Sequence, residues 1–358
     1  MIRILLLSCF FVTVLLPVGA AFSQSQGAEF LAAQRYGAQT RFTLAVTDDE
    51  GTPVSDAWVE VLLCMLDADK NHWVKGKTDE RGRFVVEGKT GGNEISIGVQ
   101  KEGYYKSRFE LCYVDMDSPR TVRDGKWLPW ASEERVVLRR IENPVELKNV
   151  ETTVNVPHTN AFFGFDIESA DWVKPYGKGE YADLCFNMNS DGKVVPDCEW
   201  FSCQIVITNR MCGAYVAHRQ LQSSFKSIYR ADTNAVYRGG FDYRRKLEGG
   251  RWVCEELGAD EELILRTRSV FDALGNPVSY KYARLDKIEF GSNGREGGCA
   301  IRLRCSFNPT PNDANLEDAE GARMARRHYR IWCKTESLAG ARCAILGGGG
   351  GSHMLLLP

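Results

Sequence analysis

The sequence predicts an all-β protein built from two antiparallel β domains. Short alternating apolar segments recur at roughly 8–12-residue spacing with turn residues between them. No helical period of useful length interrupts them in the first of these domains. The 358 residues are enough for about two domains. We expect one β domain at 41–140, a second at 150–310, and a C-terminal helix or disordered tail at 317–358.

The composition excludes some classes of partner. Hydrophobic residues make up 44% and charged residues 26% of the chain, as in ordinary soluble proteins. The formal net charge is −2, so no general attraction to nucleic acid or to a membrane surface is expected.

The N-terminus has the layout of a secretory signal peptide. A basic residue precedes the apolar run Ile4–Leu16, and small residues follow it, with cleavage expected after Ala20 or Ser23. The run is shorter than the roughly 18 apolar residues that a membrane span needs. We therefore expect a signal peptide at 1–23, an extension at 24–40, and a periplasmic, cell-surface or extracellular protein without a transmembrane span.

Three turn motifs organise the first domain. They are DEGTPVSDA at Asp49–Ala57, TDERGRF at Thr78–Phe84 and KEGY at Lys101–Tyr104, and RVVL at Arg135–Leu138 would close the domain. In this order they resemble carboxypeptidase regulatory-like domains, which are small transthyretin-like sandwiches. The segment Asp115–Ser132 departs from that pattern as an insertion.

The residues of the second motif support a tight turn between strands. Gly82 permits a positive φ angle, and Asp79 can cap the turn through its own side chain. Phe84 and Val86 share one face of the following strand. The resemblance implies a non-catalytic accessory module, and the chain has no His-x-x-Glu pair for metallocarboxypeptidase chemistry.

The second domain also alternates strands and turns, which predicts a sandwich or jelly-roll. Residues 266–285 are expected to form a hairpin with its tip at Asp272–Pro277. The segments GFDIESADWVKPYGKGEYADL and FNPTPNDANLED resemble an uncharacterised group of exported bacterial proteins. We expect a helix with a basic stripe after residue 317, then a Gly-rich tail. The stripe contains Arg323, Arg326, Arg327 and Arg330.

A cluster of acids and aromatic residues is the main candidate for catalysis. Glycoside hydrolases use two carboxyl groups beside aromatic rings that stack on sugar. A solvated acidic loop with core-facing aromatics is the alternative. The acids are Asp166, Glu168, Asp171, Glu180 and Asp183, and the aromatics are Trp172 and Tyr176.

Other catalytic signatures are missing from the sequence. His158 and His218 are isolated, and no nucleophile elbow, phosphate-binding loop or Cys-x-x-Cys occurs. We therefore expect no catalytic residue, no cofactor and no metal.

Two tryptophans in the insertion are candidate ligand platforms. Trp127 and Trp130 could stack on sugar rings or anchor a protein partner. They could instead fold back over an open end of the core.

The stretch NMNSDGKVVPDC, Asn187–Cys198, resembles a calcium loop of the EF-hand type. Cys198 stands where calcium needs a bidentate carboxylate, and the flanking sequences are strand-like. A turn between two strands is the preferred interpretation.

The cysteines permit a disulfide in an exported protein. The chain has twelve, and eleven remain once the signal peptide with Cys9 is removed. Cys64 and Cys112 are the pair we expect to form a bridge, because both fall on strands of the first domain.

Two functional hypotheses follow. The first is an exported, non-catalytic binding or structural module of the bacterial envelope, whose partner would be a glycan or another envelope protein. The alternative is a carbohydrate-active protein that uses the acids and aromatics of residues 166–183.

Overall fold

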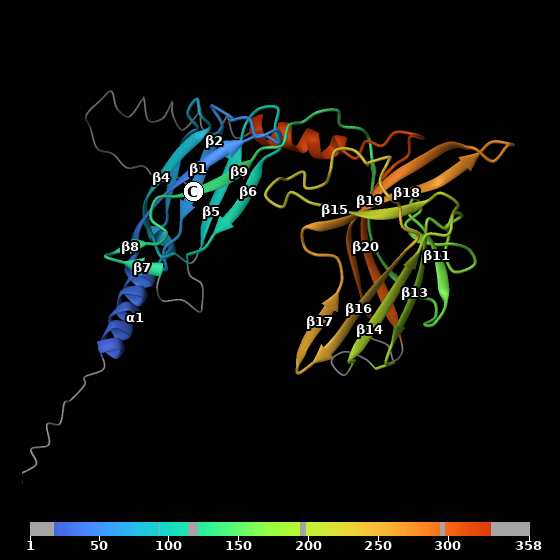
Figure 1. Ribbon diagram of the computed structural model, residues 1–358, viewed down its shortest axis with the longest axis horizontal. Helices are drawn as coiled ribbons and strands as arrows, with labels where there is room; N and C mark the ends of the chain where they lie inside the picture. The colour runs from blue at the N-terminus through green and yellow to red at the C-terminus, as the bar shows by residue number, and fades with distance from the viewer. Residues whose placement is uncertain (1–17, 93, 114–120, 194–197, 294–297, 331–358) are drawn as a thin grey trace, which may run out of the picture. The chain divides into compact units, whose positions relative to one another are not determined.

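The computed structural model of the chain describes residues 18–92, 94–113, 121–193, 198–293 and 298–330 (Figure 1). The protein is all-β, as the sequence predicts, and the described residues form mainly antiparallel strands in four sheets. The chain divides into two compact units. The first contains residues up to 47, 52–99 and 108–136, and the second contains 48–51, 100–107 and the chain from 137 onward. Most of the predicted signal peptide and the Gly-rich tail lie outside the described residues.

The segment expected to be an extension is largely helical. Helix α1 spans Val18–Tyr36 and is rich in Ala and Gln, which favour helix. Gly37 has a φ of +76° and its amide donates to the carbonyl of Ala33, so it ends the helix as a C-terminal cap.

Two sheets form the first unit. One contains β1 (Ala38–Thr47), β4 (Arg83–Thr90), β7 (Val122–Arg123), β8 (Lys126–Trp127) and β9 (Ser132–Val137). The other contains β2 (Trp58–Leu63), β3 (His72–Lys77), β5 (Ile95–Gln100) and β6 (Ser107–Leu111), with a short 3₁₀ helix at Ala68–Lys70 between β2 and β3. Alternate residues of β1 are buried, among them Phe42, Leu44 and Val46, as the period of two in a strand requires.

The turn that precedes β4 confirms the local prediction. The Asp79 carboxylate accepts hydrogen bonds from the amides of Arg81 and Arg83 at 2.9 and 2.8 Å. Gly82 has a φ of +70°, and a Cβ atom there would lie 2.4 Å from the carbonyl oxygen of Val46. Only glycine therefore fits this position.

Two sheets also form the second unit, and they pack face to face. One contains β10 (Lys148–Asn155), β15 (Gly213–His218), β18 (Glu261–Phe271), β19 (Pro277–Ser292) and β20 (Cys299–Asn308). The other runs in the order β12 (Asp171–Trp172), β11 (Phe162–Asp166), β13 (Leu184–Ser190), β14 (Trp200–Val206), β16 (Gly240–Glu248) and β17 (Arg251–Glu255). Both contribute to one apolar core, for example through Phe186 and Ile205 from one sheet and Leu265 and Ile301 from the other.

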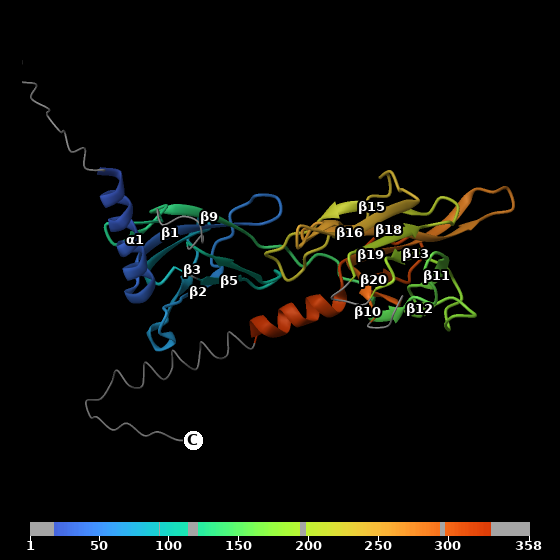
Figure 2. The ribbon, with the colours of Figure 1, turned by 90° about the horizontal axis from the view of Figure 1, so that it is seen from below.

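The predicted hairpin at 266–285 is present as β18 and β19, and its tip extends beyond the rest of its sheet in both views (Figures 1 and 2). The predicted C-terminal helix is present at residues 319–330, where Ala322 packs against Tyr105 and Phe225 of the same unit. Among the described residues, no helix is both long and apolar enough to cross a membrane.

Replacing Gly82 tests the turn before β4. Gly82→Ala should lower the free energy of unfolding by about 2–4 kcal/mol, because the new Cβ meets backbone atoms and the φ is positive. Gly125→Ala is the matched control, since Gly125 has a φ of +67° with no atom within 4 Å of an added Cβ. It should cost only about 1–2 kcal/mol. Urea unfolding measures both losses, and equal losses would contradict the steric argument.

Candidate functional site

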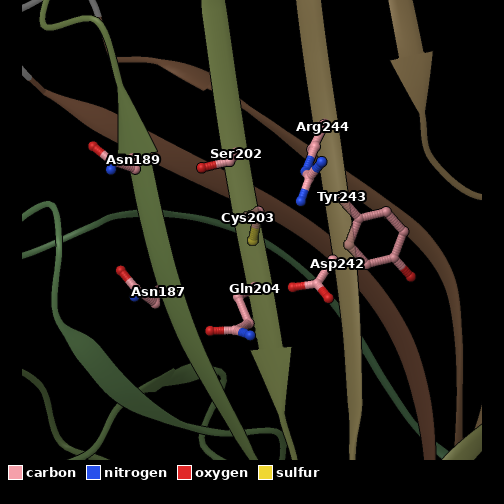
Figure 3. Close-up of a pocket in the computed structure, with 8 residues that line it drawn as sticks. All are labelled: Asn187, Asn189, Ser202, Cys203, Gln204, Asp242, Tyr243 and Arg244. Atoms are coloured by element: carbon pink, nitrogen blue, oxygen red, sulfur yellow. The ribbon is translucent and has the colours of Figure 1, made fainter.

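A hollow lies on the outer face of the six-stranded sheet, across β13, β14 and β16 (Figure 3). Its volume is about 220 Å³. We call it the polar groove. Its lining residues are Asn187, Asn189, Ser202, Cys203, Gln204, Asp242, Tyr243 and Arg244.

The strand register arranges the outward side chains of the polar groove in two rows. Residues directly opposite each other on neighbouring strands project from the same face. The strands are about 4.8 Å apart, and successive outward residues of one strand are about 7 Å apart. The first row is Asn187, Gln204 and Asp242, and the second is Asn189, Ser202 and Arg244.

Most of these side chains have unused hydrogen-bonding capacity. Within the described part of the chain, no side-chain hydrogen bond or ion pair engages five of the six. The exception is Asn189, whose Oδ1 accepts from the amide of Ser190 at 3.0 Å. The Oδ1 of Asn187 is shielded from water and has no partner among the described residues. A buried acceptor without a partner carries a desolvation cost.

The alternate residues of the same strands face the core. Cys203 and Tyr243 are buried, and burial is the main reason that both have raised pKa values. For the Cys203 thiol the pKa rises to about 12, with a smaller contribution from Cys299. A thiol with this pKa stays protonated near neutral pH and is a poor nucleophile. The buried Cys203 thiol therefore does not supply the polar groove with a reactive nucleophile.

Three of the five candidate catalytic acids are held by one guanidinium group. Arg268, on β18, donates from Nη2 to Asp166 at 2.7 Å and to Asp183 at 2.8 Å. Its Nε donates to Asp183 at 3.0 Å, and its Nη1 donates to Glu168. Asp166 and Asp183 are 5% and 0% exposed, so these carboxylates are part of the interior rather than the walls of an open cleft.

The backbone helps to aim Arg268 at these acids. Its φ is +52°, and the register of β18 against β19 shifts between Thr267 and Val270. Such a bulge redirects a side chain out of the regular alternation.

Asp166 is unsuited to act as a general acid. Burial raises its pKa, but backbone amides of Glu180, Ser169 and Tyr181 and the charge of Arg268 lower it more, so the net pKa lies below its usual value. A catalytic proton donor at neutral pH needs a raised pKa.

The other two acids also have structural partners. Asp171 accepts from the amides of Trp172 and Lys178, and the exposed Glu180 pairs with Lys174 at 3.1 Å. The whole segment 166–183 is organised as a hydrogen-bonded loop.

The predicted ligand-binding aromatics occupy different environments. Trp127 is fully buried, donates from Nε1 to the carbonyl of Thr90 at 2.8 Å and stacks on Tyr113, so it covers the core and cannot serve as an exposed platform. Trp172 is 4% exposed and donates to the carbonyl of Asn155. The indole N–H of each tryptophan therefore already has a hydrogen-bond acceptor within the protein.

Trp130 and Tyr176 are the more accessible of the four. Trp130 is half-buried beneath the Lys126 ammonium, which lies 5.0 Å from its ring centroid. Tyr176 is 51% exposed and packs edge-on against Phe163 and His158. Trp127 and Trp130 belong to the first unit, and Trp172 and Tyr176 belong to the second.

Cys64 and Cys112 are not joined by a disulfide, which corrects the expected bridge. They follow β2 and β6, and β5 lies between these strands in the sheet. Two strand spacings are roughly 9.5 Å, well beyond the roughly 4.4–6.8 Å between the Cα atoms of a disulfide.

The described residues of the calcium-like stretch lie at the end of β13 and just before β14, which pair antiparallel, as preferred from the sequence. The Asp191 carboxylate accepts from the amides of Lys193 and Glu199 at 3.1 and 2.7 Å, and Gly192 has a φ of +81°. Residues 194–197 lie outside the described residues. No group of three or more potential metal ligands occurs among the residues that are described.

Sequence reasoning missed the polar groove. Its signal is the polar–apolar–polar triplets NMN, SCQ and DYR. Each triplet alone is an ordinary strand pattern, and only the register shows that the three lie side by side.

No family model and no curated protein sequence matches the chain. Among solved structures, it is similar to 3-chlorocatechol 1,2-dioxygenase from Rhodococcus opacus 1CP, with 14% identity, 29% of this chain and 61% of that chain covered, and a TM-score of 0.23. A variant of catechol 1,2-dioxygenase from Acinetobacter radioresistens gives 16% identity, 30% and 53% coverage, and a TM-score of 0.22. A variant of shaft pilin spaA from Lactobacillus rhamnosus GG gives 10% identity, 66% and 89% coverage, and a TM-score of 0.17. This chain therefore spans less than two thirds of the dioxygenases, and scores this low do not establish a shared fold.

Removing the Arg268 charge should destabilise the second unit strongly. Arg268→Met leaves buried carboxylates without their partner and should cost about 3–5 kcal/mol in thermal or urea unfolding. Arg302→Met is the control, because Arg302 is 47% exposed in its pair with Glu151 and should cost less than about 1 kcal/mol. Similar losses for the two variants would contradict an interior ion cluster.

The lowered pKa of Asp166 predicts a pH dependence of stability. The ionised carboxylate favours the folded state, so its contribution is complete above the unfolded pKa of about 4 and is lost as pH falls through the lower folded pKa. Asp166→Asn should therefore show a shallower fall in unfolding free energy between about pH 5 and pH 2 than the wild type. Denaturant titrations at each pH measure this difference, and parallel curves would refute it.

Proposed function

We propose that the protein is a non-catalytic binding module and that the polar groove binds a saccharide. The observation that carries this proposal is the set of six neighbouring polar side chains in a hollow, five of which have no side-chain partner among the described residues. Such groups offer donors and acceptors to a ligand without breaking bonds within the protein.

The charges of the polar groove favour an uncharged ligand. Asp242 contributes one negative and Arg244 one positive charge, and the other outward residues are amides or a hydroxyl. Amides and hydroxyls both donate and accept, which matches the hydroxyl groups of a sugar.

An apolar residue continues the first row of the polar groove. Phe162, on β11, stands opposite Asn187 and is 50% exposed. An exposed ring beside polar groups suits the apolar face of a sugar, since ligand sites combine apolar surface with a few directed polar groups.

Two features of the sequence support the wider proposal of an exported module. The N-terminal segment has the composition of a signal peptide. The turn motifs at Asp49–Ala57, Thr78–Phe84 and Lys101–Tyr104 resemble those of carboxypeptidase regulatory-like domains, which are accessory modules. We therefore propose that the mature chain acts at or outside the bacterial envelope.

A glycan array with the purified mature chain tests the saccharide proposal, followed by calorimetric titration with the glycan that gives the strongest signal. Gln204→Ala should weaken that binding about five-fold, the effect of one lost side-chain hydrogen bond of about 1 kcal/mol. Gln39→Ala removes another exposed strand glutamine, on β1, and should leave the affinity unchanged.

A blank array would contradict a saccharide ligand. Binding that Gln204→Ala and Gln39→Ala reduce equally would contradict the polar groove as its site.

A further inference from the structure

Strand β17 is an exposed edge of the second unit. It ends the six-stranded sheet, and Figure 1 shows it as the outermost strand beside β16. All five residues, Arg251–Glu255, are exposed, and no further strand pairs with it within the described part of the chain. Exposed edges are templates for pairing with another strand.

The hairpin geometry determines which backbone groups face outward. Gly249 and Gly250 form a two-residue turn with φ angles of +57° and +80°, so the flanking pair Glu248 and Arg251 is hydrogen-bonded. Hydrogen-bonded and non-bonded pairs then alternate along the strands. Arg251, Val253 and Glu255 therefore bond toward β16.

The next pair, Leu247 and Trp252, is the non-bonded kind. The amide of Leu247 donates instead to the carbonyl of Glu199 on the other side of β16, at 2.7 Å. It follows that the N–H and C=O groups of Trp252 and Cys254 face away from the sheet.

We propose that β17 pairs antiparallel with β17 of a second copy of this chain, in a register centred on Val253. This register places Trp252 of each copy opposite Cys254 of the other, so all the outward amides and carbonyls of both residues bond across the interface. It also places Arg251 of each copy opposite Glu255 of the other, as non-bonded pairs whose side chains approach most closely. The strand is thus self-complementary in hydrogen bonds and in charge.

The side chains of β17 favour pairing with a second copy of the chain. Trp252 and Val253 are 41% and 50% exposed, so pairing covers apolar surface. A register centred on Trp252 would place Arg251 opposite Val253, and one centred on Cys254 would place Glu255 opposite Val253. In either register, only one residue of β17 per copy would form backbone hydrogen bonds to β17 of the other copy. Five residues per copy make a small interface, so the dimer is concentration-dependent.

Charge reversal tests the register. Arg251→Glu alone places like charges opposite each other twice in the dimer, and so does Glu255→Arg alone. Each should raise the dimer dissociation constant about ten-fold or more in analytical ultracentrifugation. An equimolar mixture of the two variants restores both attractive pairs and should dimerise like the wild type. A wild type that stays monomeric to millimolar concentration, or a mixture no stronger than its components, would overturn the proposal.

Crosslinking gives an independent readout of the same register. Val253 faces its own copy across the two-fold axis at about 4.5 Å between Cα atoms, which a disulfide can span. Val253→Cys should therefore form a covalent dimer rapidly under mild oxidation. Val236→Cys replaces a valine that is 82% exposed outside β17, and it should crosslink only at the slow rate of random collision. Equal rates for the two variants would count decisively against β17 pairing.

Discussion

The guanidinium of Arg268 is the interaction on which the second unit depends. It extends from one sheet of the sandwich to Asp166 at the end of β11 in the other, so it joins the two layers through charge as well as through apolar packing. A partly buried guanidinium is stabilised when anions and acceptors surround it, and here Asp183 and Glu168 complete that shell. Because these acids are also bonded to backbone amides, the cluster determines the path of the chain from β11 to β13.

That path brings β11 and β13 into register, and the rows of the polar groove depend on that register. Phe165 lies opposite Leu184, beside the loop that Asp166 and Asp183 organise. Because this pair sets the register, Phe162, three residues earlier on β11, lies opposite Asn187. The acids that suggested catalysis therefore act indirectly, by positioning strands whose outward residues line the groove.

The sequence predicted local features well and non-local ones poorly. The alternation of strands gave the all-β class, and the turn at Asp79 and Gly82 follows from interactions within five residues of the chain. Trp127 was uncertain because a tryptophan in a loop can turn inward or outward, and its packing on Tyr113 depends on a distant segment. The prediction of a bridge between Cys64 and Cys112 was wrong for a similar reason, because the sequence of a single strand does not determine the order of strands in the sheet.

The polar residues of β13, β14 and β16 alternate with core residues along the same strands. Inward and outward positions are therefore under different constraints. Inward positions such as Phe186 and Ile205 are constrained by packing, whereas outward positions such as Gln204 and Asp242 are exposed. Substitutions at the outward positions leave the packing density of the sandwich unchanged. The chemistry of this surface can therefore be changed one residue at a time while the packing of the core beneath it is kept.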